Sequence, residues 1–144
     1  MQSKLKKNLI ENRGFSPLHW ASRNGHSKVC KILIENQVNK NSKTFYFDGV
    51  WTPLHLAAWN GQLEACKVLL ENQVETRRKV GFNKTTALHL AARKGHLDVC
   101  KTLIQYGLEK NGKNLIFFGK TPLEFAAENC HLGVVCYLRD QLSL

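Results

Sequence analysis

A short motif recurs four times along the chain at a nearly constant interval. It reads Ser-Pro-Leu-His from Ser16, Thr-Pro-Leu-His from Thr52, Thr-Ala-Leu-His from Thr86 and Thr-Pro-Leu-Glu from Thr121. The copies therefore start 36, 34 and 35 residues apart. Such a period is typical of solenoids, in which each copy is one supersecondary unit that buries its apolar face against its neighbours. We expect the repeat to organise the whole chain.

Each copy predicts a pair of short helices. In the first copy Ser16 is placed to cap a helix whose first residue is Pro17, and Gly25 permits the left-handed turn that ends it. A second helix with a broad apolar face is predicted from Ser27 to Glu35. Helices this short are marginal in isolation, so each pair should persist only by stacking on its neighbours. We predict eight short helices, about half of the chain, and almost no regular sheet.

The connectors between the helix pairs are rich in turn-forming residues but also contain aromatic residues. These are the run Phe45-Tyr46-Phe47, then Phe82, and then Phe117-Phe118. They either fold back onto the stacked helices or project from the connector as contact residues. The sequence leaves both readings open.

Length and composition predict one intracellular domain. The chain has 144 residues, 43% of them hydrophobic, which is enough for a packed core. It has no run of about 18 apolar residues, and its first residues lack the apolar segment of a secretory signal, so we expect a cytoplasmic or nuclear location. Cys30, Cys66 and Cys100 recur at one repeat position, where adjacent helices would hold them too far apart for disulfides. We expect them to be small buried residues in a reducing compartment.

The motif with its flanking residues resembles the ankyrin repeat. The resemblance rests on T-P-L-H-L-A-A, a helix-breaking glycine, and a second helix containing V-L-L. It implies an all-α ankyrin-repeat solenoid of four stacked helix-turn-helix units within one domain, 1–144. The repeats would span about 11–46, 47–80, 81–115 and 116–144, after an entry connector at 1–10. Since the family period is about 33 residues, the finger loops should be elongated here.

Several positions depart from the family pattern. Gln37 and Gln73 stand where the family ends its second helix with a glycine, which Gly107 keeps. A residue other than glycine in a left-handed conformation costs roughly 1 kcal/mol, so these junctions are either strained or turn differently. In the fourth copy Glu124 replaces the histidine and Cys130 replaces the glycine between the helices. That copy therefore departs most from the pattern.

The residues that could carry chemistry do not form a catalytic or metal site in the sequence. His26 with Cys30, and His96 with Cys100, are four residues apart, but a closed zinc site needs four converging ligands. The resemblance implies instead that histidines in both repeat positions make structural hydrogen bonds. No phosphate-binding loop or dinucleotide fingerprint occurs, and the predicted core cysteines lack the exposure that a nucleophile needs. We predict no enzyme activity, no cofactor and no metal.

The function is then expected at the surface, as a scaffold for protein-protein interaction. The resemblance implies a concave face formed by fingers and first helices, and we expect a partner protein of acidic or mixed character to bind there. Trp59 is the strongest candidate, because solvent exposure of a tryptophan ring is unfavourable and tryptophan is enriched in binding hot spots. The alternative is that Trp59 covers the neighbouring finger. The candidate contact residues are Phe15, Arg23, Phe47, Trp51, Trp59, Phe82, Arg93, Lys94, Phe117 and Lys120.

A second function class follows from the formal net charge of +10, which favours nucleic acid or an anionic lipid surface. The basic residues concerned are the run Arg77-Arg78-Lys79 and the repeated Lys31, Lys67 and Lys101. Salt distinguishes the classes, because binding to phosphates weakens steeply with salt.

The C-terminal segment carries a further expectation. Its apolar residues have no following repeat to cover them, and they are Val134, Val135, Tyr137, Leu138, Leu142 and Leu144. We therefore predict an uncovered apolar face that either packs against a further segment of a longer protein or self-associates.

Overall fold

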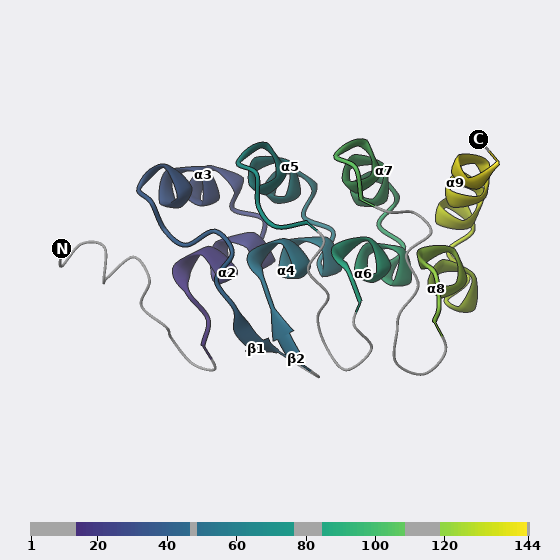
Figure 1. Ribbon diagram of the computed structural model, residues 1–144, viewed down its shortest axis with the longest axis horizontal. Coiled ribbons are helices and arrows are strands. Elements are labelled where there is room, and N and C mark those ends of the chain that lie inside the picture. The colour runs from purple at the N-terminus through teal and green to yellow at the C-terminus, as the bar shows by residue number, and fades with distance from the viewer. Residues whose placement is uncertain (1–13, 47–48, 77–84, 109–118, 144) are drawn as a thin grey trace.

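The computed structural model describes residues 14–46, 49–76, 85–108 and 119–143, and its helices lie in two rows (Figure 1). The first row holds the first helix of each repeat: α2 (Pro17–Arg23), α4 (Pro53–Trp59), α6 (Ala87–Lys94) and α8 (Pro122–Glu128). The second row holds α3 (Ser27–Glu35), α5 (Leu63–Glu71), α7 (Leu97–Gln105) and α9 (Leu132–Leu142). Each helix packs against its partner in the repeat and against the equivalent helix of the next repeat. This arrangement confirms the predicted helical solenoid.

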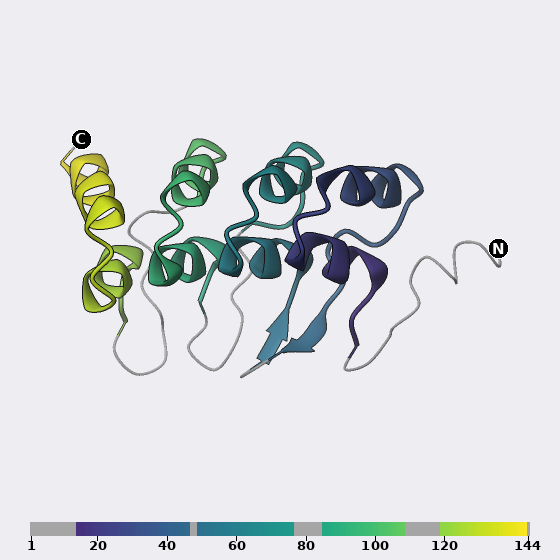
Figure 2. The same cartoon turned by 180° about the vertical axis from the view of Figure 1, so that it is seen from behind.

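The described residues contain a single sheet, a hairpin in the first finger. Its strands are β1 (Thr44–Tyr46) and β2 (Gly49–Trp51), which pair antiparallel with Thr44 opposite Trp51. The hairpin projects from the first row of helices, on the side away from the second row (Figure 2). The prediction of almost no regular sheet agrees with these two three-residue strands.

The predicted start and stop signals explain the helix bounds. Thr52 has the extended backbone of an N-cap, with φ −104° and ψ 168°, and Pro53 follows as the first residue of α4. After α4 the chain reverses at Gly61, where φ is +68°. A Cβ atom there would lie 2.6 Å from the His96 ring, so both the backbone conformation and the close approach of the next repeat require glycine.

Glutamine takes the glycine conformation at two repeat junctions. Gln37 and Gln73 have φ of 63° and 58°, while Gly107, at the same repeat position, has φ of 86°. Cys130, which replaces the glycine between α8 and α9, has φ of 59°. The junctions therefore turn in the left-handed way of the family pattern, and the non-glycine residues carry the strain.

One apolar core runs through all four repeats, from Leu18 in α2 to Leu138 in α9. Cys30, Cys66 and Cys100 lie within it, are fully buried and form no disulfide. Burial raises the pKa of the Cys66 and Cys100 thiols to about 12. These thiols therefore stay protonated at neutral pH, and the prediction that they act as small core residues is confirmed.

The prediction of an uncovered apolar face at the C-terminal end is wrong for the residues that the structure describes. Val134, Val135 and Leu138 are buried in the core, with Leu138 only 1% exposed, because helical spacing places them on the side of α9 that meets α7 and α8. Tyr137 is partly buried against the same core, and Leu132 and Leu142 are exposed. Leu144 lies outside the described residues.

None of the helices in the described ranges is both long enough and apolar enough to cross a bilayer.

Candidate protein-interaction surface

A cluster of aromatic rings lies where the first finger meets the first row of helices. We call it the aromatic cluster, and its members are Phe15, Trp20, Tyr46, Trp51 and Trp59. Trp51 is central: its ring centre lies 5.3 Å from that of Tyr46 and 5.6 Å from that of Trp59, both in edge-to-face geometry. Phe15 extends the cluster to Trp20 at 4.8 Å and to Tyr46 at 5.5 Å. Such contacts hold the rings in defined positions.

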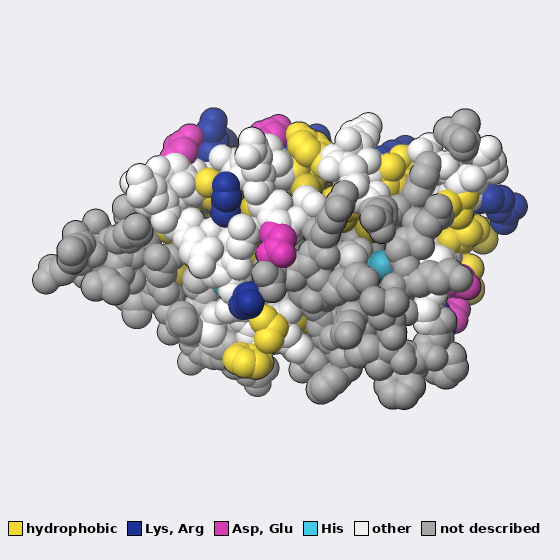
Figure 3. Space-filling model, viewed as in Figure 1, with side chains coloured by type: hydrophobic (Ala, Val, Ile, Leu, Met, Phe, Trp, Pro, Cys, Tyr) yellow, Lys and Arg dark blue, Asp and Glu magenta, His cyan; other side chains and the backbone are white. Residues whose placement is uncertain are grey.

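The hairpin determines which aromatic residues enter the cluster. Successive side chains of a strand point to opposite faces, so Tyr46 and Trp51 pack against the helices while Phe45 points away. Phe45 is 72% exposed. An apolar patch is visible at the position of the hairpin in Figure 3. Of the connector aromatics that the structure describes, Tyr46 therefore folds back onto the helices and Phe45 projects from the finger.

Cationic side chains lie close to several of these rings. The Arg23 guanidinium lies 5.6 Å from the ring centres of both Trp20 and Tyr46. The Arg93 guanidinium lies 5.8 Å from the Trp59 ring and 5.9 Å from the Phe125 ring. At these distances a cation is attracted to the ring face. The surface therefore combines rigid aromatic groups with positive charge.

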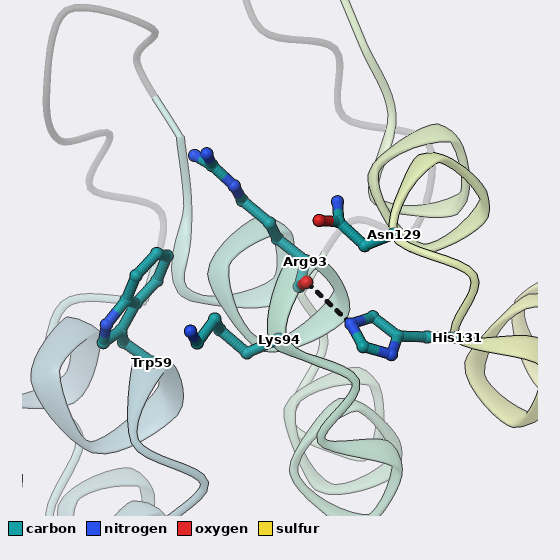
Figure 4. Close-up of a pocket in the computed structure, with 5 residues that line it drawn as sticks. All are labelled: Trp59, Arg93, Lys94, Asn129 and His131. Atoms are coloured by element: carbon teal, nitrogen blue, oxygen red, sulfur yellow. Dashed lines mark hydrogen bonds between the residues drawn. The ribbon is translucent and has the colours of Figure 1, made fainter.

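Between the ends of α4, α6 and α8 the surface forms an open depression of about 310 Å³ (Figure 4). Its lining residues are Trp59, Arg93, Lys94, Asn129 and His131. The Lys94 Nζ atom lies 4.7 Å from the centre of the Trp59 ring, so the indole contacts two cations. Among the described residues, none of the side chains that line this depression is acidic. An anionic group would therefore be attracted to the described side chains there.

Hydrogen bonds from the following repeat fix the ends of the first helices. The Nε2 atom of His131 donates to the Arg93 carbonyl at 2.9 Å, and that of His96 donates to the Trp59 carbonyl at 3.0 Å. At the same repeat position Gln62 donates to the Arg23 carbonyl at 3.1 Å. Burial lowers the pKa of His96, which favours the neutral ring. These bonds hold the backbone that carries Arg23, Trp59 and Arg93.

The predicted contact residues fall into four groups. Arg23 and Trp59 are partly exposed, and Arg93 and Lys94 are exposed, so all four are accessible. Phe15 and Trp51 are each only 3% exposed and lie beneath the surface, where they support Tyr46 and Trp59. Lys120 is partly exposed and forms an ion pair with Glu128 at 2.6 Å. Phe47, Phe82 and Phe117 lie outside the described residues.

Three aromatic contributors to the surface are not among the predicted contact residues: Trp20, Tyr46 and Phe125. In the sequence, Tyr46 stands out only as one of the connector aromatics. Phe125 stands four residues after Thr121, as Trp20 stands four after Ser16, so an aromatic residue at that repeat position was the available signal. Its ring receives Arg93 and, at 6.0 Å, Lys120.

Within the described ranges no three His, Cys, Asp or Glu side chains are grouped so that they could hold a metal ion. The two cysteines outside the core, Cys130 and Cys136, are exposed.

Comparison with known families identifies the repeat. A family model for ankyrin repeats in three copies matches residues 2–80 and residues 54–143. A search of the curated proteins finds no match. Domains of this family are generally modules for protein-protein interaction and are typically non-enzymatic. Because the matches span most of the sequence and the two rows of helices agree with them, the chain belongs to the ankyrin-repeat family.

Proposed function

We propose that this protein is a non-enzymatic scaffold that binds another protein through the concave surface formed by its fingers and first helices. The observation that carries the proposal is the environment of Trp59. Its indole is partly exposed, rests against buried Trp51, and has Arg93 and Lys94 beside it. Tryptophan and arginine in well-packed positions are the residues that dominate protein-protein binding energy.

The surface is suited to binding because its parts are already ordered. The aromatic cluster and the hydrogen bonds at the helix ends hold the side chains before a partner arrives. A preorganised surface loses less conformational entropy on binding, which leaves more of the contact energy as affinity. Rigid rings of this kind are also efficient contact groups, because they bury a large area at low entropic cost.

We propose a partner of acidic or mixed character. In the part of the chain that the structure describes, no carboxylate lies within ion-pair distance of Arg23, Arg93 or Lys94. These charges are therefore available to an acidic partner, and complementary charge speeds association and selects the partner. The proposal also places the protein in a reducing compartment, the cytoplasm or nucleus, since its cysteines are free thiols.

Binding to nucleic acid or an anionic membrane is less well supported. Lys67 forms an ion pair with Glu64 at 2.9 Å, and Lys101 lies 5.7 Å from the Tyr137 ring. On the face in Figure 3 the Lys and Arg side chains are dispersed and do not form one block. Arg77, Arg78 and Lys79 lie outside the described residues. The observations favour a partner protein.

The test is to isolate a partner from a reducing lysate on the immobilised chain and to measure its affinity for purified variants. Trp59→Ala and Arg93→Ala should each weaken binding by more than about 1 kcal/mol, with the melting temperature nearly unchanged. Lys31→Ala, an exposed charge on α3 in the other row of helices, is the matched control and should have little effect.

The opposite pattern would replace this proposal with the electrostatic one. In that case Trp59→Ala would bind normally, the lysine variants would be weakened, and affinity would fall by roughly 10³ or more between 50 and 200 mM salt, as release of counterions from nucleic acid predicts.

A further inference from the structure

We infer that this surface selects an extended acidic segment of its partner, in which two carboxylates about six residues apart flank one apolar side chain. The inference rests on the proposed function and specifies the sequence that the surface recognises. It follows from three side chains that occupy one repeat position. Arg23, Trp59 and Arg93 each stand seven residues after the first residue of the repeated motif. We call them the ladder.

The positions of the ladder residues determine the distance between its two arginines. Its members lie on α2, α4 and α6, which pack side by side in that order. Packed helices have axes about 8 to 10 Å apart, so Arg23 and Arg93, two steps apart, are separated by roughly 16 to 20 Å. An extended chain advances about 3.3 Å per residue, and its side chains point alternately to opposite faces. Two carboxylates that contact both arginines from one face of an extended segment therefore stand about six residues apart.

The two arginines are presented in similar ways. Each guanidinium lies near two aromatic rings, at 5.6 Å from both for Arg23 and at 5.8 and 5.9 Å for Arg93. Ring contact orients a guanidinium without using its N–H donors as hydrogen bonds to the protein. Among the described residues no carboxylate pairs with either one. The donor fork of each arginine is thus available for a carboxylate, the anion that it fits in a bidentate manner.

The ladder also indicates which residue lies at the middle of the proposed binding site and at which repeat the site ends. Trp59 lies between the arginines and presents a partly exposed ring, which an apolar side chain of the segment would cover. In the fourth repeat the equivalent residue is Glu128, and it forms an ion pair with Lys120 at 2.6 Å. The sign of the charge at this position is therefore reversed after the third repeat. This restricts the acidic segment to the first three repeats.

Phage display of random peptides against the full chain tests the inference without a known partner. Selected peptides should contain two acidic residues about six positions apart, with an apolar residue between them. A synthetic consensus peptide should then bind, and Arg23→Glu and Arg93→Glu should each reduce its affinity by about tenfold or more, since like charges placed together are repulsive. Lys31→Glu makes the same charge change on α3 and should reduce affinity by less than about threefold at moderate salt.

A charge exchange separates recognition from loss of folding. Replacing one acidic residue of the consensus peptide with lysine should restore binding to one arginine variant and not to the other, and replacing the second acidic residue should do the reverse. Variants that do not fold cannot give this result.

Three other outcomes of the peptide selection would lead to different conclusions. Peptides that require Trp59 but lack the paired acidic residues would overturn the inference and leave the scaffold proposal intact. The inference would also fail if binding depended on only one of the two arginines. If no selected peptide depended on Trp59, both proposals would be overturned.

Discussion

At the scale of single residues, the left-handed glutamines show how the repeat tolerates an unfavourable backbone. At Gln73 the turn is closed by backbone hydrogen bonds from Gln73 to Leu70, at 3.0 Å, and from Val74 to Leu69, at 3.4 Å. Val74 is buried in the core beyond the turn. These contacts offset the strain of φ 58° at a residue other than glycine. The repeat register identified the position, but it could not show whether the turn was kept or altered.

Gln73→Gly should therefore stabilise the protein. Relief of the left-handed strain exceeds the added entropy of the unfolded chain, and we expect the free energy of unfolding to rise by about 0.5 to 1 kcal/mol, measured by urea denaturation. Gly107→Ala is the reverse control at the same repeat position. A Cβ atom there meets nothing within 4 Å, so an expected loss of about 1 kcal/mol would come from backbone strain and not from a clash. A neutral or destabilising Gln73→Gly would show that the observed turn carries no strain.

At the scale of elements, the first finger shows which features local sequence patterns do not predict. The motifs predicted α3 with its observed bounds, Ser27–Glu35, because capping and apolar period are local properties. They did not predict whether Tyr46 or Phe45 would pack inward. That choice depends on the pairing of β1 with β2, since a shift of one residue would exchange the two faces. Ion pairs between side chains also determine which cationic groups remain available to a partner. Lys120 is paired with Glu128, whereas Arg93 has no carboxylate partner among the described residues.

His19 joins a helix to the following finger, and its burial predicts sensitivity to acid. Its Nδ1 atom accepts a hydrogen bond from the Ser16 N–H at 3.0 Å, so the neutral ring carries its proton on Nε2 and donates to the Ser42 carbonyl at 3.1 Å. Burial lowers the pKa of His19 from 6.5 to about 4, although hydrogen bonds to the Trp51 and Ser42 backbones oppose the shift. The unfolded chain therefore binds the proton more readily than the folded protein.

The stability contributed by neutral His19 should be complete above pH 6.5 and should be lost progressively as the pH falls towards about 4. Urea denaturation at a series of pH values measures this loss. His19→Gln removes the titrating group, so its free energy of unfolding should depend less on pH in that window than that of the unmodified protein, whatever its stability at pH 7. Identical pH dependence of the two proteins would exclude His19 as the source.

At the scale of the whole molecule, the repeat predicted the solenoid because each helix pair contacts only its neighbours. The prediction of an uncovered apolar face on α9 is wrong, although the repeat register in the sequence already indicated that these residues are buried. Val134, Val135 and Leu138 stand 35 residues after Val99, Cys100 and Leu103, and this is the interval between the third and fourth copies. Both sets are buried, so the register already assigned the apolar residues of α9 to the inner side. The number of apolar residues alone does not show on which side of the helix they lie.

The same neighbour rule predicts that stability is uneven along the stack. Among the described elements α5 packs between α3 and α7, whereas α9 packs against α7 on one side only and less extensively. Amide hydrogen exchange should therefore be faster in α9 than in α5, because a terminal unit can open while the rest stays folded.

Leu54 and Leu138 give a matched pair of substitutions, since each side chain is 1% exposed and truncation of a buried leucine typically costs about 2 to 5 kcal/mol. Leu138→Ala should reduce protection in α8 and α9 and leave α4 and α5 nearly unchanged, whereas Leu54→Ala, in an internal repeat, should reduce protection in all four repeats. Equal loss of protection throughout the chain in both variants would show instead that the repeats open only as one unit.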